Sequence, residues 1–446
     1  MKIGLAGLGR IQFDIEEASR LYKQIANFLN ETFPQAEIVT GAELATTPEQ
    51  AINIAHQLKS AGVDALVLHL ATFTDSSLIT ALFTELDVPT ILWAMPEPSI
   101  GDATRLRLNS LCGVNLAAYT LTSSGRKYRY VYGLPGEVEV KTELSRNIGA
   151  LSLDRTLRSL KLGVIGSRPP GFFPSGYDEL KLWKEIGPHI QLYNLNQIFG
   201  AAGEIPPDTT EEVRSMLQSC LNGLHELPDQ VVCTAANTYQ ALTELATKEG
   251  LGALAVKCWP EFFVEHQAAA CGVLAALSEN GITAACEADV HGAVTMKALS
   301  LLSGAPTFLA DLVSMDRQKD SIVLWHCGNA AFSLSANPKE RKAGVHSNRK
   351  VGVTAMFPLK PGRVTLARLS YSQGKYRLLV LEGEALDSPL LFMGNTAEVR
   401  PDVGGKKLLD TIVYGGYEHH MVMAYGHYAD SLSAWGELLG IEVVRL

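Results

Sequence analysis

The sequence predicts an α/β protein with two doubly wound α/β domains, followed by a C-terminal domain with an antiparallel, β-barrel-like sheet. Apolar runs of buried-strand length alternate with helical segments in the first 306 residues, as in parallel sheets. The run LKLGVIGS at 160–167 mirrors MKIGLAG at the N-terminus, so a second series begins there. From 352 to 386, apolar and polar residues alternate, which is typical of antiparallel strands. The predicted domains are residues 1–158, 159–306 and 307–446.

In the first domain, the continuous apolar runs 3–8, 65–70 and 90–94 are predicted strands. Residues 16–33 have the apolar spacing of an amphipathic helix. In the second domain, strands are expected in 160–167, IQLYNL, 231–237, 253–259 and TAACEAD. After 307, strands are expected in the run that carries Asp311, in the run that ends at His326, and in HHMVMAYG near the C-terminus.

Composition excludes several classes of protein. Of the 446 residues, 47% are apolar and 19% charged, which is ordinary for a globular protein. The net charge of −9 gives no basis for binding nucleic acid or an anionic membrane. Seven cysteines without a CxxC pair indicate buried free thiols in a reducing compartment. No signal core or membrane-spanning run is apparent, so we expect a cytoplasmic protein.

Three apolar runs each deliver an acid or an imidazole at or near their ends. Glu287 and Asp289 end the first run, Asp311 lies in the second, and His326 ends the third. If 287–289 is a strand, both carboxylates point to the same face, which is costly unless they are paired, protonated or bound to metal. Carboxylates with histidine at strand ends suit a hard divalent cation.

Other candidate groups have competing interpretations. His419 and His420 are adjacent in a strand-like run and are expected to face opposite ways, so only one of them could ligate a metal. Glu261 and Glu265 follow a strand-like run and are either site acids or acids of a first helical turn. The basic segment 339–350 is either a solvated loop or a lid that meets an anionic group of a substrate.

A nicotinamide enzyme is a further alternative, because GLAGLGR at 4–10 is rich in glycine. The glycine spacing does not match GxGxxG, and no acidic residue ends a second strand about 20 residues further on. An apolar strand end with small residues is the preferred interpretation.

The chain resembles the L-fucose and L-arabinose isomerase family. The matching elements, in order, are ALAVKCWPEF, GITAACEADVHGAVTM, PTFLADLVSMD, SIVLWHCGNAAFSL, GRVTLARLS and EHHMVMAYGHYAD. The resemblance implies three domains, aldose–ketose isomerisation of a sugar with Mn²⁺ or another divalent cation such as Mg²⁺ or Co²⁺, and a homo-oligomer, trimer or hexamer. It also implies that Glu287 or Asp289 is a metal ligand and acid/base, that His420 is a ligand, and that His326 lies near a further metal-site histidine.

The family has a first catalytic glutamate upstream of the CEAD-like segment, where this chain offers Glu261, Glu265 or Cys271. We therefore expect Glu287 and Asp289 to serve as ligand and base, with Glu261 or Glu265 as the second acid/base. Two alternatives remain open. One is a carbon–carbon lyase or epimerase at the same metal site, and the other is a non-catalytic sugar-binding protein.

Overall fold

The computed structural model describes residues 1–101 and 105–446, which form two compact units, Met1–Arg155 and Thr156–Leu446. The unit boundary lies close to the domain boundary predicted at 158. In the second unit, buried side chains from both sides of the boundary predicted at 306, such as Leu254 and Leu366, belong to one hydrophobic core. The division of this unit into two domains therefore stays a prediction.

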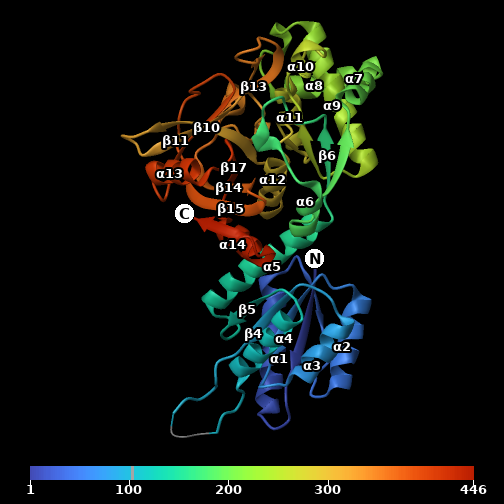
Figure 1. The fold of residues 1–446 in the computed structure, drawn as a ribbon, viewed down its shortest axis with the longest axis vertical. Coiled ribbons are helices and arrows are strands. Elements are labelled where there is room, and N and C mark those ends of the chain that lie inside the picture. Colours follow the sequence, from blue (N-terminus) through green and yellow to red (C-terminus); the bar gives the residue numbers. More distant parts are fainter. Residues whose placement is uncertain (102–104) are drawn as a thin grey trace. The chain divides into compact units, whose positions relative to one another are not determined.

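The first unit is built on a five-stranded parallel sheet, as the alternating pattern predicted (Figure 1). The strand order is β2-β1-β3-β4-β5. Its strands are β1 Lys2–Leu8, β2 Glu37–Thr40, β3 Ala65–Leu70, β4 Thr90–Ala94 and β5 Tyr128–Tyr132. Its helices are α1 Ile15–Thr32, α2 Pro48–Ala61, α3 Ser76–Glu85, α4 Ser110–Ser123 and α5 Val138–Arg158, the last of which crosses the unit boundary.

Local sequence signals fix the ends of these helices. Asp14 caps α1 by accepting a hydrogen bond from the backbone N–H of Glu17 at 3.0 Å. Thr47 opens α2 with a capping box, and Gly62 ends that helix in a left-handed conformation (φ +68°). Buried residues of α2, α3 and α4 share one core with the sheet, so these three helices cover the same face.

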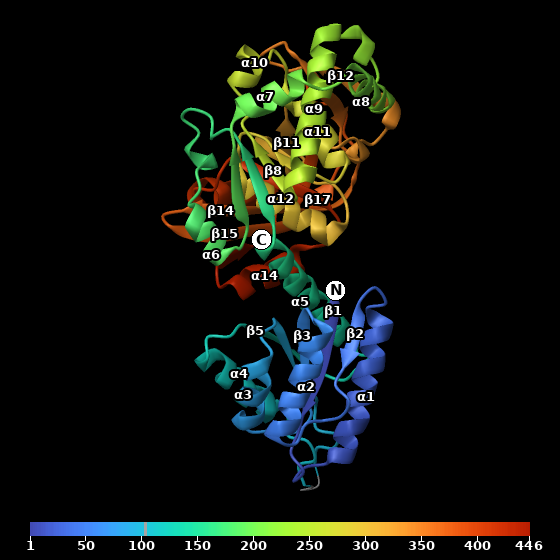
Figure 2. The ribbon, with the colours of Figure 1, turned by 90° about the vertical axis from the view of Figure 1, so that its right-hand side faces the viewer.

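The second unit begins with a four-stranded parallel sheet in the order β7-β6-β8-β9 (Figure 2). These strands are β6 Lys161–Ile165, β7 His189–Tyr193, β8 Ala253–Val256 and β9 Thr283–Ala285. The helices here are α6 Glu179–Glu185, α7 Leu195–Gly203, α8 Pro207–Cys220, α9 Asp229–Glu249, α10 Glu261–Val264, α11 Ala270–Glu279 and α12 Val290–Ser303.

The strand predicted at 231–237 is wrong, because these residues lie within helix α9. The apolar run is short, and a run of this length does not distinguish a buried strand from part of a buried helix. In the structure, Val232, Ala235, Ala236 and Tyr239 are buried at helical spacing.

The remaining strands form a nine-stranded mixed sheet in the order β12-β13-β16-β11-β10-β17-β14-β15-β18. Pairing of β15 with β16 links the strands from β16 to β15 into a closed cycle of antiparallel neighbours. The expected antiparallel sheet is therefore present, and its barrel geometry stays a prediction. The strands are β10 Phe308–Asp316, β11 Ser321–His326, β12 Lys342–Val345, β13 Gly352–Pro358, β14 Gly362–Ser372, β15 Lys375–Ala385, β16 Asn395–Pro401, β17 His420–Tyr425 and β18 Glu442–Arg445, with helices α13 Gly405–Gly415 and α14 Ala429–Leu439.

The basic segment 339–350 is not simply a loop, because it contains β12, which pairs with β13 at the edge of the sheet. None of the described helices is both long enough and apolar enough to cross a bilayer.

Candidate metal and active site

The candidate site lies where the carboxyl end of β9 meets β10 and β17. The register of the antiparallel pair β10–β17 puts Asp311 directly opposite His420. Strand β9 ends at Ala285, and Glu287 and Ala288 follow with positive φ values of 58° and 50°. This turn corrects the expectation that Glu287 and Asp289 share one strand face. Instead, Asp289 caps helix α12 by accepting from the Gly292 N–H at 2.8 Å.

Asp289 is a buried carboxylate whose two oxygens are already engaged. The Arg368 guanidinium donates to both of them, with one distance of 3.1 Å, and Nδ1 of His420 lies 2.9 Å from Oδ2. Arg368 also approaches Glu418, at 3.4 Å. Burial alone would raise the pKa of Asp289, but Arg368 and His420 hold this pKa well below its ordinary value. Asp289 is therefore ionised and acts as an acceptor.

The hydrogen bond with Asp289 fixes the tautomer of His420. Because an ionised carboxylate only accepts, Nδ1 of His420 carries the proton and Nε2 keeps a free lone pair. This Nε2 is buried and has no hydrogen-bond partner among the described residues, and the same holds for Oδ1 of Asp311. Nε2 lies 3.6 Å from Oδ1 of Asp311 and 3.5 Å from Oε2 of Glu287. Nε2 of His420 thus lies between two carboxylates, and ligand atoms of Glu287, His419 and His420 all lie within 4.8 Å of one another, as expected for a cation site.

His419 also contacts Glu287, with Nε2 3.0 Å from Oε2. That only one of the two histidines could ligate a metal stays a prediction, but both of them reach the same carboxylate instead of facing opposite ways. The reason is that β17 begins at His420, so His419 lies outside the strand alternation. Burial would lower the pKa of His419, but the hydrogen bond with Glu287 and the charges of Asp311, Glu287 and Asp289 together raise it. Burial by itself would raise the pKa of Glu287. The hydrogen bond with His419 and the nearby imidazoles lower it below its ordinary value.

His326 is buried beside the cluster, with its ring centroid 5.7 Å from that of His420. Its Nδ1 accepts a hydrogen bond from the backbone N–H of Cys327 at 2.8 Å. A neutral imidazole in this arrangement has its proton on Nε2, which is then a donor. The geometry thus favours a hydrogen-bonding role for His326, and its assignment as a metal ligand stays a prediction.

Glu261 and Glu265 are not brought into the carboxylate–imidazole cluster by any contact of the described residues. Glu261 forms an ion pair with Lys257, and its Oε2 is buried with no hydrogen-bond partner in the described part of the chain. Glu265 is exposed at the end of the short helix α10. Their proposed part as the second acid/base stays a prediction.

The candidate ligands from the sequence left out Asp311, and Arg368 was not singled out at all. Asp311 was seen only as an acid within an apolar run. Arg368 lies in the alternating run GRVTLARLS, where an arginine among buried residues was the available signal, and its side chain is 1% exposed. A buried arginine requires a carboxylate partner, and Asp289 is that partner.

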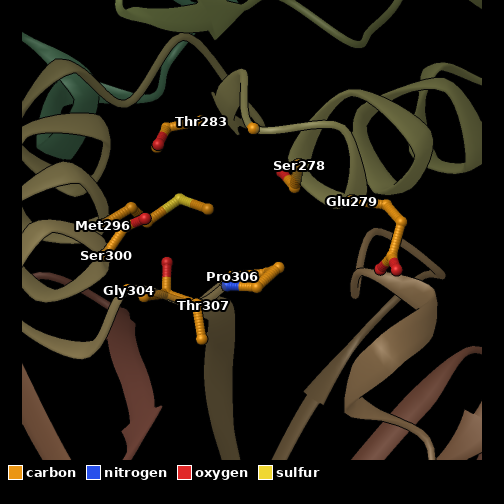
Figure 3. Close-up of a pocket in the computed structure, with 10 residues that line it drawn as sticks. Ser278, Glu279, Thr283, Met296, Ser300, Gly304, Pro306 and Thr307 are labelled. Carbon is orange, nitrogen blue, oxygen red and sulfur yellow. The ribbon is translucent and has the colours of Figure 1, made fainter.

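Two cavities of the second unit differ in their relation to this site. One of about 170 Å³ lies at the amino end of β9, lined by Ser278, Thr283, Met296 and Thr307 among others (Figure 3). Another of about 570 Å³ lies at the carboxyl ends of β6, β7 and β8, the edge of the sheet from which Glu287 also projects. Ligands of open α/β sheets bind at this edge.

Family models and related proteins both match this chain, and they agree on one family. Residues 4–150 match the model of the fucose/sulfoquinovose isomerase N-terminal domain, and residues 324–446 match the L-fucose isomerase C-terminal domain. The chain is 33% identical over 437 residues to a sulfoquinovose isomerase of Priestia aryabhattai, covering 98% of this chain and 97% of the relative. It is 35% identical over 406 residues to a sulfoquinovose isomerase of Alkalicoccus urumqiensis, covering 91% and 90%.

Proposed function

We propose a substrate and a mechanism for this chain, which belongs to the fucose/sulfoquinovose isomerase family and is a sugar isomerase, an intramolecular oxidoreductase. We propose that it converts sulfoquinovose, or a closely related sulfonated aldose, into the corresponding ketose, with a divalent cation and through an ene-diolate. The substrate rests on the relatives that match nearly the whole chain, which are sulfoquinovose isomerases. The metal rests on one observation: Nε2 of His420, buried and without a hydrogen-bond partner among the described residues, lies 3.5 Å from Oε2 of Glu287 and 3.6 Å from Oδ1 of Asp311.

We assign Glu287, Asp311 and His420 as the residues that hold the cation, which is Mn²⁺ or another hard divalent ion. When bound, such an ion polarises a sugar carbonyl and stabilises the negative charge of the ene-diolate. Two carboxylates and an imidazole supply the oxygen and nitrogen ligands that Mn²⁺ accepts. This assignment replaces Asp289 with Asp311, because both oxygens of Asp289 already accept hydrogen bonds from Arg368.

The reaction needs one group to remove the proton from C2 of the aldose and return it to C1, and another to move a proton between O1 and O2. Glu287 and Asp311 are the two partly exposed carboxylates of the cluster, 17% and 27% exposed, so both are open to a substrate. We assign the carbon proton to one of them and the oxygen proton to the other. His326, with Nε2–H as a donor, would bind a substrate oxygen. Asp289 and Arg368 position His420 and do not touch the sugar.

The test is proton NMR of purified protein with sulfoquinovose and Mn²⁺ in deuterated water, beside a chelator control. The expected result is deuterium at the exchanging carbon together with the ketose, and loss of both with chelator. Exchange without the ketose would favour an epimerase or lyase. Metal-independent binding without exchange would favour a sugar-binding protein.

We further propose that the chain forms a homo-oligomer. Leu390, Leu391, Phe392 and Met393 are four consecutive apolar residues, each between 38% and 50% exposed. Exposed apolar runs of this kind mark protein interfaces. Light scattering coupled to size exclusion tests this proposal, and a monomer at micromolar concentration would contradict it.

A further inference from the structure

The cavity at the carboxyl ends of β6, β7 and β8 contains groups that the isomerisation chemistry does not use. Its polar lining comes from the segments after three strands: Ser167, Arg168 and Ser175 after β6, Asn194 after β7, and Lys257 after β8. Gly166 has φ +80°, and a Cβ there would meet the Cβ of Lys257 and Cγ of Leu195 at 3.1 Å each. A side chain at position 166 would therefore press on two residues that line the cavity.

The charge of this cavity favours an anion. Two lining residues are cationic, and among the described residues that line it none is acidic. Lys257 is partly neutralised by its ion pair with Glu261, which leaves Arg168 as the uncompensated charge. The Arg168 guanidinium lies 4.9 Å from the centroid of the Phe173 ring, which orients it, and no carboxylate contact of this group is present in the described structure.

An unsatisfied donor points to the same conclusion. Ser175 is 2% exposed, lines the cavity, and its Oγ has no hydrogen-bond partner among the described residues. A buried hydroxyl without a partner is costly, so a ligand acceptor at this position would stabilise the site. Arginine and hydroxyl donors together are a usual environment for a tetrahedral oxyanion.

The cavity and the cation site lie on the same edge of the sheet. The Ala288 N–H, between Glu287 and Asp289, donates to the carbonyl of Val256, the residue before Lys257, at 3.0 Å. Only β8 separates β6 from β9, so the ends of these two strands are about 10 Å apart. An extended six-carbon sugar with a terminal sulfonate is of comparable length. The loop from Gly166 to Tyr177 connects the two regions, because the Phe172 ring lies 5.6 Å from that of His419.

We propose that this cavity is the sulfonate subsite of the enzyme, in which Arg168 and Ser175 bind the anionic end of the sugar while its carbonyl end lies at Glu287. The inference rests on the proposed function and adds the residues that select a sulfonated substrate over a neutral one. It assigns specificity to Arg168 rather than to the basic segment 339–350, in which the Arg349 guanidinium lies over the Phe263 ring.

The experiment compares Arg168→Met, Arg168→Lys and Ser175→Ala with wild type and with Arg349→Met as the matched loss of an exposed arginine. Each protein is assayed with sulfoquinovose and with its 6-deoxy analogue, which lacks the sulfonate. We expect Arg168→Met to raise KM for sulfoquinovose roughly 10- to 100-fold, as for a lost charged hydrogen bond, with little change in kcat or toward the analogue. Arg168→Lys should raise KM for sulfoquinovose less than Arg168→Met does, and Ser175→Ala should also raise it less. Arg349→Met should have the KM of wild type.

Unchanged selectivity in Arg168→Met, or a loss in Arg349→Met instead, would overturn the subsite. A wild-type preference for an aldose 6-phosphate would overturn the sulfonate as the bound group. Calorimetric titration with 3-hydroxypropanesulfonate separates this inference from the proposed function. If wild type does not isomerise sulfoquinovose but binds this probe in an Arg168-dependent way, the function fails and the subsite stands. If wild type converts sulfoquinovose but binds the probe equally well with and without Arg168, the proposed function stands and the subsite fails.

Discussion

At the scale of single residues, Glu287 and Asp311 are the carboxylates that face the free nitrogen of His420. Glu287→Gln and Asp311→Asn each remove a ligand charge and a proton acceptor while keeping side-chain shape. We expect kcat to fall by about 10²–10⁴-fold or more in each, with little change in melting temperature. Steady-state kinetics measures the first effect and thermal unfolding the second. Asp410→Asn, on the exposed helix α13, is the matched control, and near-normal turnover in both site variants would remove the assignment.

The same two substitutions should also weaken metal binding. We expect Mn²⁺ to raise the melting temperature of wild type and of the Asp410→Asn control, because a ligand that binds only the folded state stabilises it. Asp311→Asn should lose most of this shift, since its Oδ1 is one of the two unpartnered atoms of the site. Metal content after purification without chelator provides an independent readout. An undiminished shift in Asp311→Asn would contradict its role as a ligand.

Whether Asp289 is a catalytic base can be tested by asking if excess Mn²⁺ restores the activity of a variant that lacks its carboxylate. Asp289→Asn leaves Nδ1 of His420 without its ionised acceptor, and we expect the affinity for metal to fall about 10- to 100-fold. Excess Mn²⁺ should then restore much of kcat, because Asp289 positions His420 and does not take a proton. The measurement is activity against Mn²⁺ concentration. Failure of saturating metal to restore turnover in a folded variant would indicate that Asp289 is the base, as the sequence first suggested.

At the scale of elements, the start of helix α12 couples packing to the site. A Cβ at Gly292 would lie 2.5 Å from Oδ2 of Asp289 and 3.0 Å from Cδ1 of Leu309. Gly292→Ala should therefore displace the Asp289 carboxylate and reduce activity at low metal concentration, although alanine is the better helix former. Gly200→Ala in α7 is the matched control, since nothing lies within 4 Å of a Cβ there. It should stabilise the fold by up to about 1 kcal/mol and leave kinetics unchanged. Equal kinetics for both variants would contradict this coupling.

At the scale of the whole molecule, buried histidines make stability depend on pH. His69 is fully buried in the first unit, and burial lowers its pKa to about 4, against the opposing contact with the Trp93 carbonyl. The unfolded chain takes up this proton near the ordinary pKa of about 6.5. The contribution is thus complete above pH 6.5 and is lost as the pH falls toward 4, by a few kcal/mol at most.

His69→Gln removes this titration while keeping a polar side chain. We expect the unfolding free energy of the variant to depend less steeply on pH than that of wild type between pH 6.5 and 4, whatever its absolute stability. Denaturant unfolding at several pH values measures the difference. Parallel curves for the two proteins would show that His69 does not set the acid stability of the first unit.

The sequence by itself determined the order of elements in most of the chain. The runs at 65–70 and 90–94 are the strands β3 and β4 without a residue of difference, because strands buried on both faces read as continuous apolar segments. The alternation after 352 likewise identified antiparallel strands, although residues 364–370 of β14 are all buried, so that both faces of this strand are covered. It failed at 231–237, where an apolar run too short to show its period is part of helix α9. The sequence also supplied Glu287, His326 and His420 as candidate site residues, as acids and imidazoles at strand ends, and in the structure Glu287 and His326 both lie close to His420.

Only the tertiary structure decided which carboxylate is paired with an arginine and which has an unpaired oxygen among the described residues. Asp289 and Asp311 look alike in sequence, each an acid beside an apolar run. Arg368, 79 positions after Asp289, engages both oxygens of Asp289, whereas strand register puts Asp311 opposite His420 with an oxygen left free. The pattern of apolar and polar residues along a short stretch of sequence indicates which residues are buried and whether the stretch is a helix or a strand. Which carboxylate is paired and which is free depends on contacts between segments far apart in the chain, and these exist only once the sheet has formed.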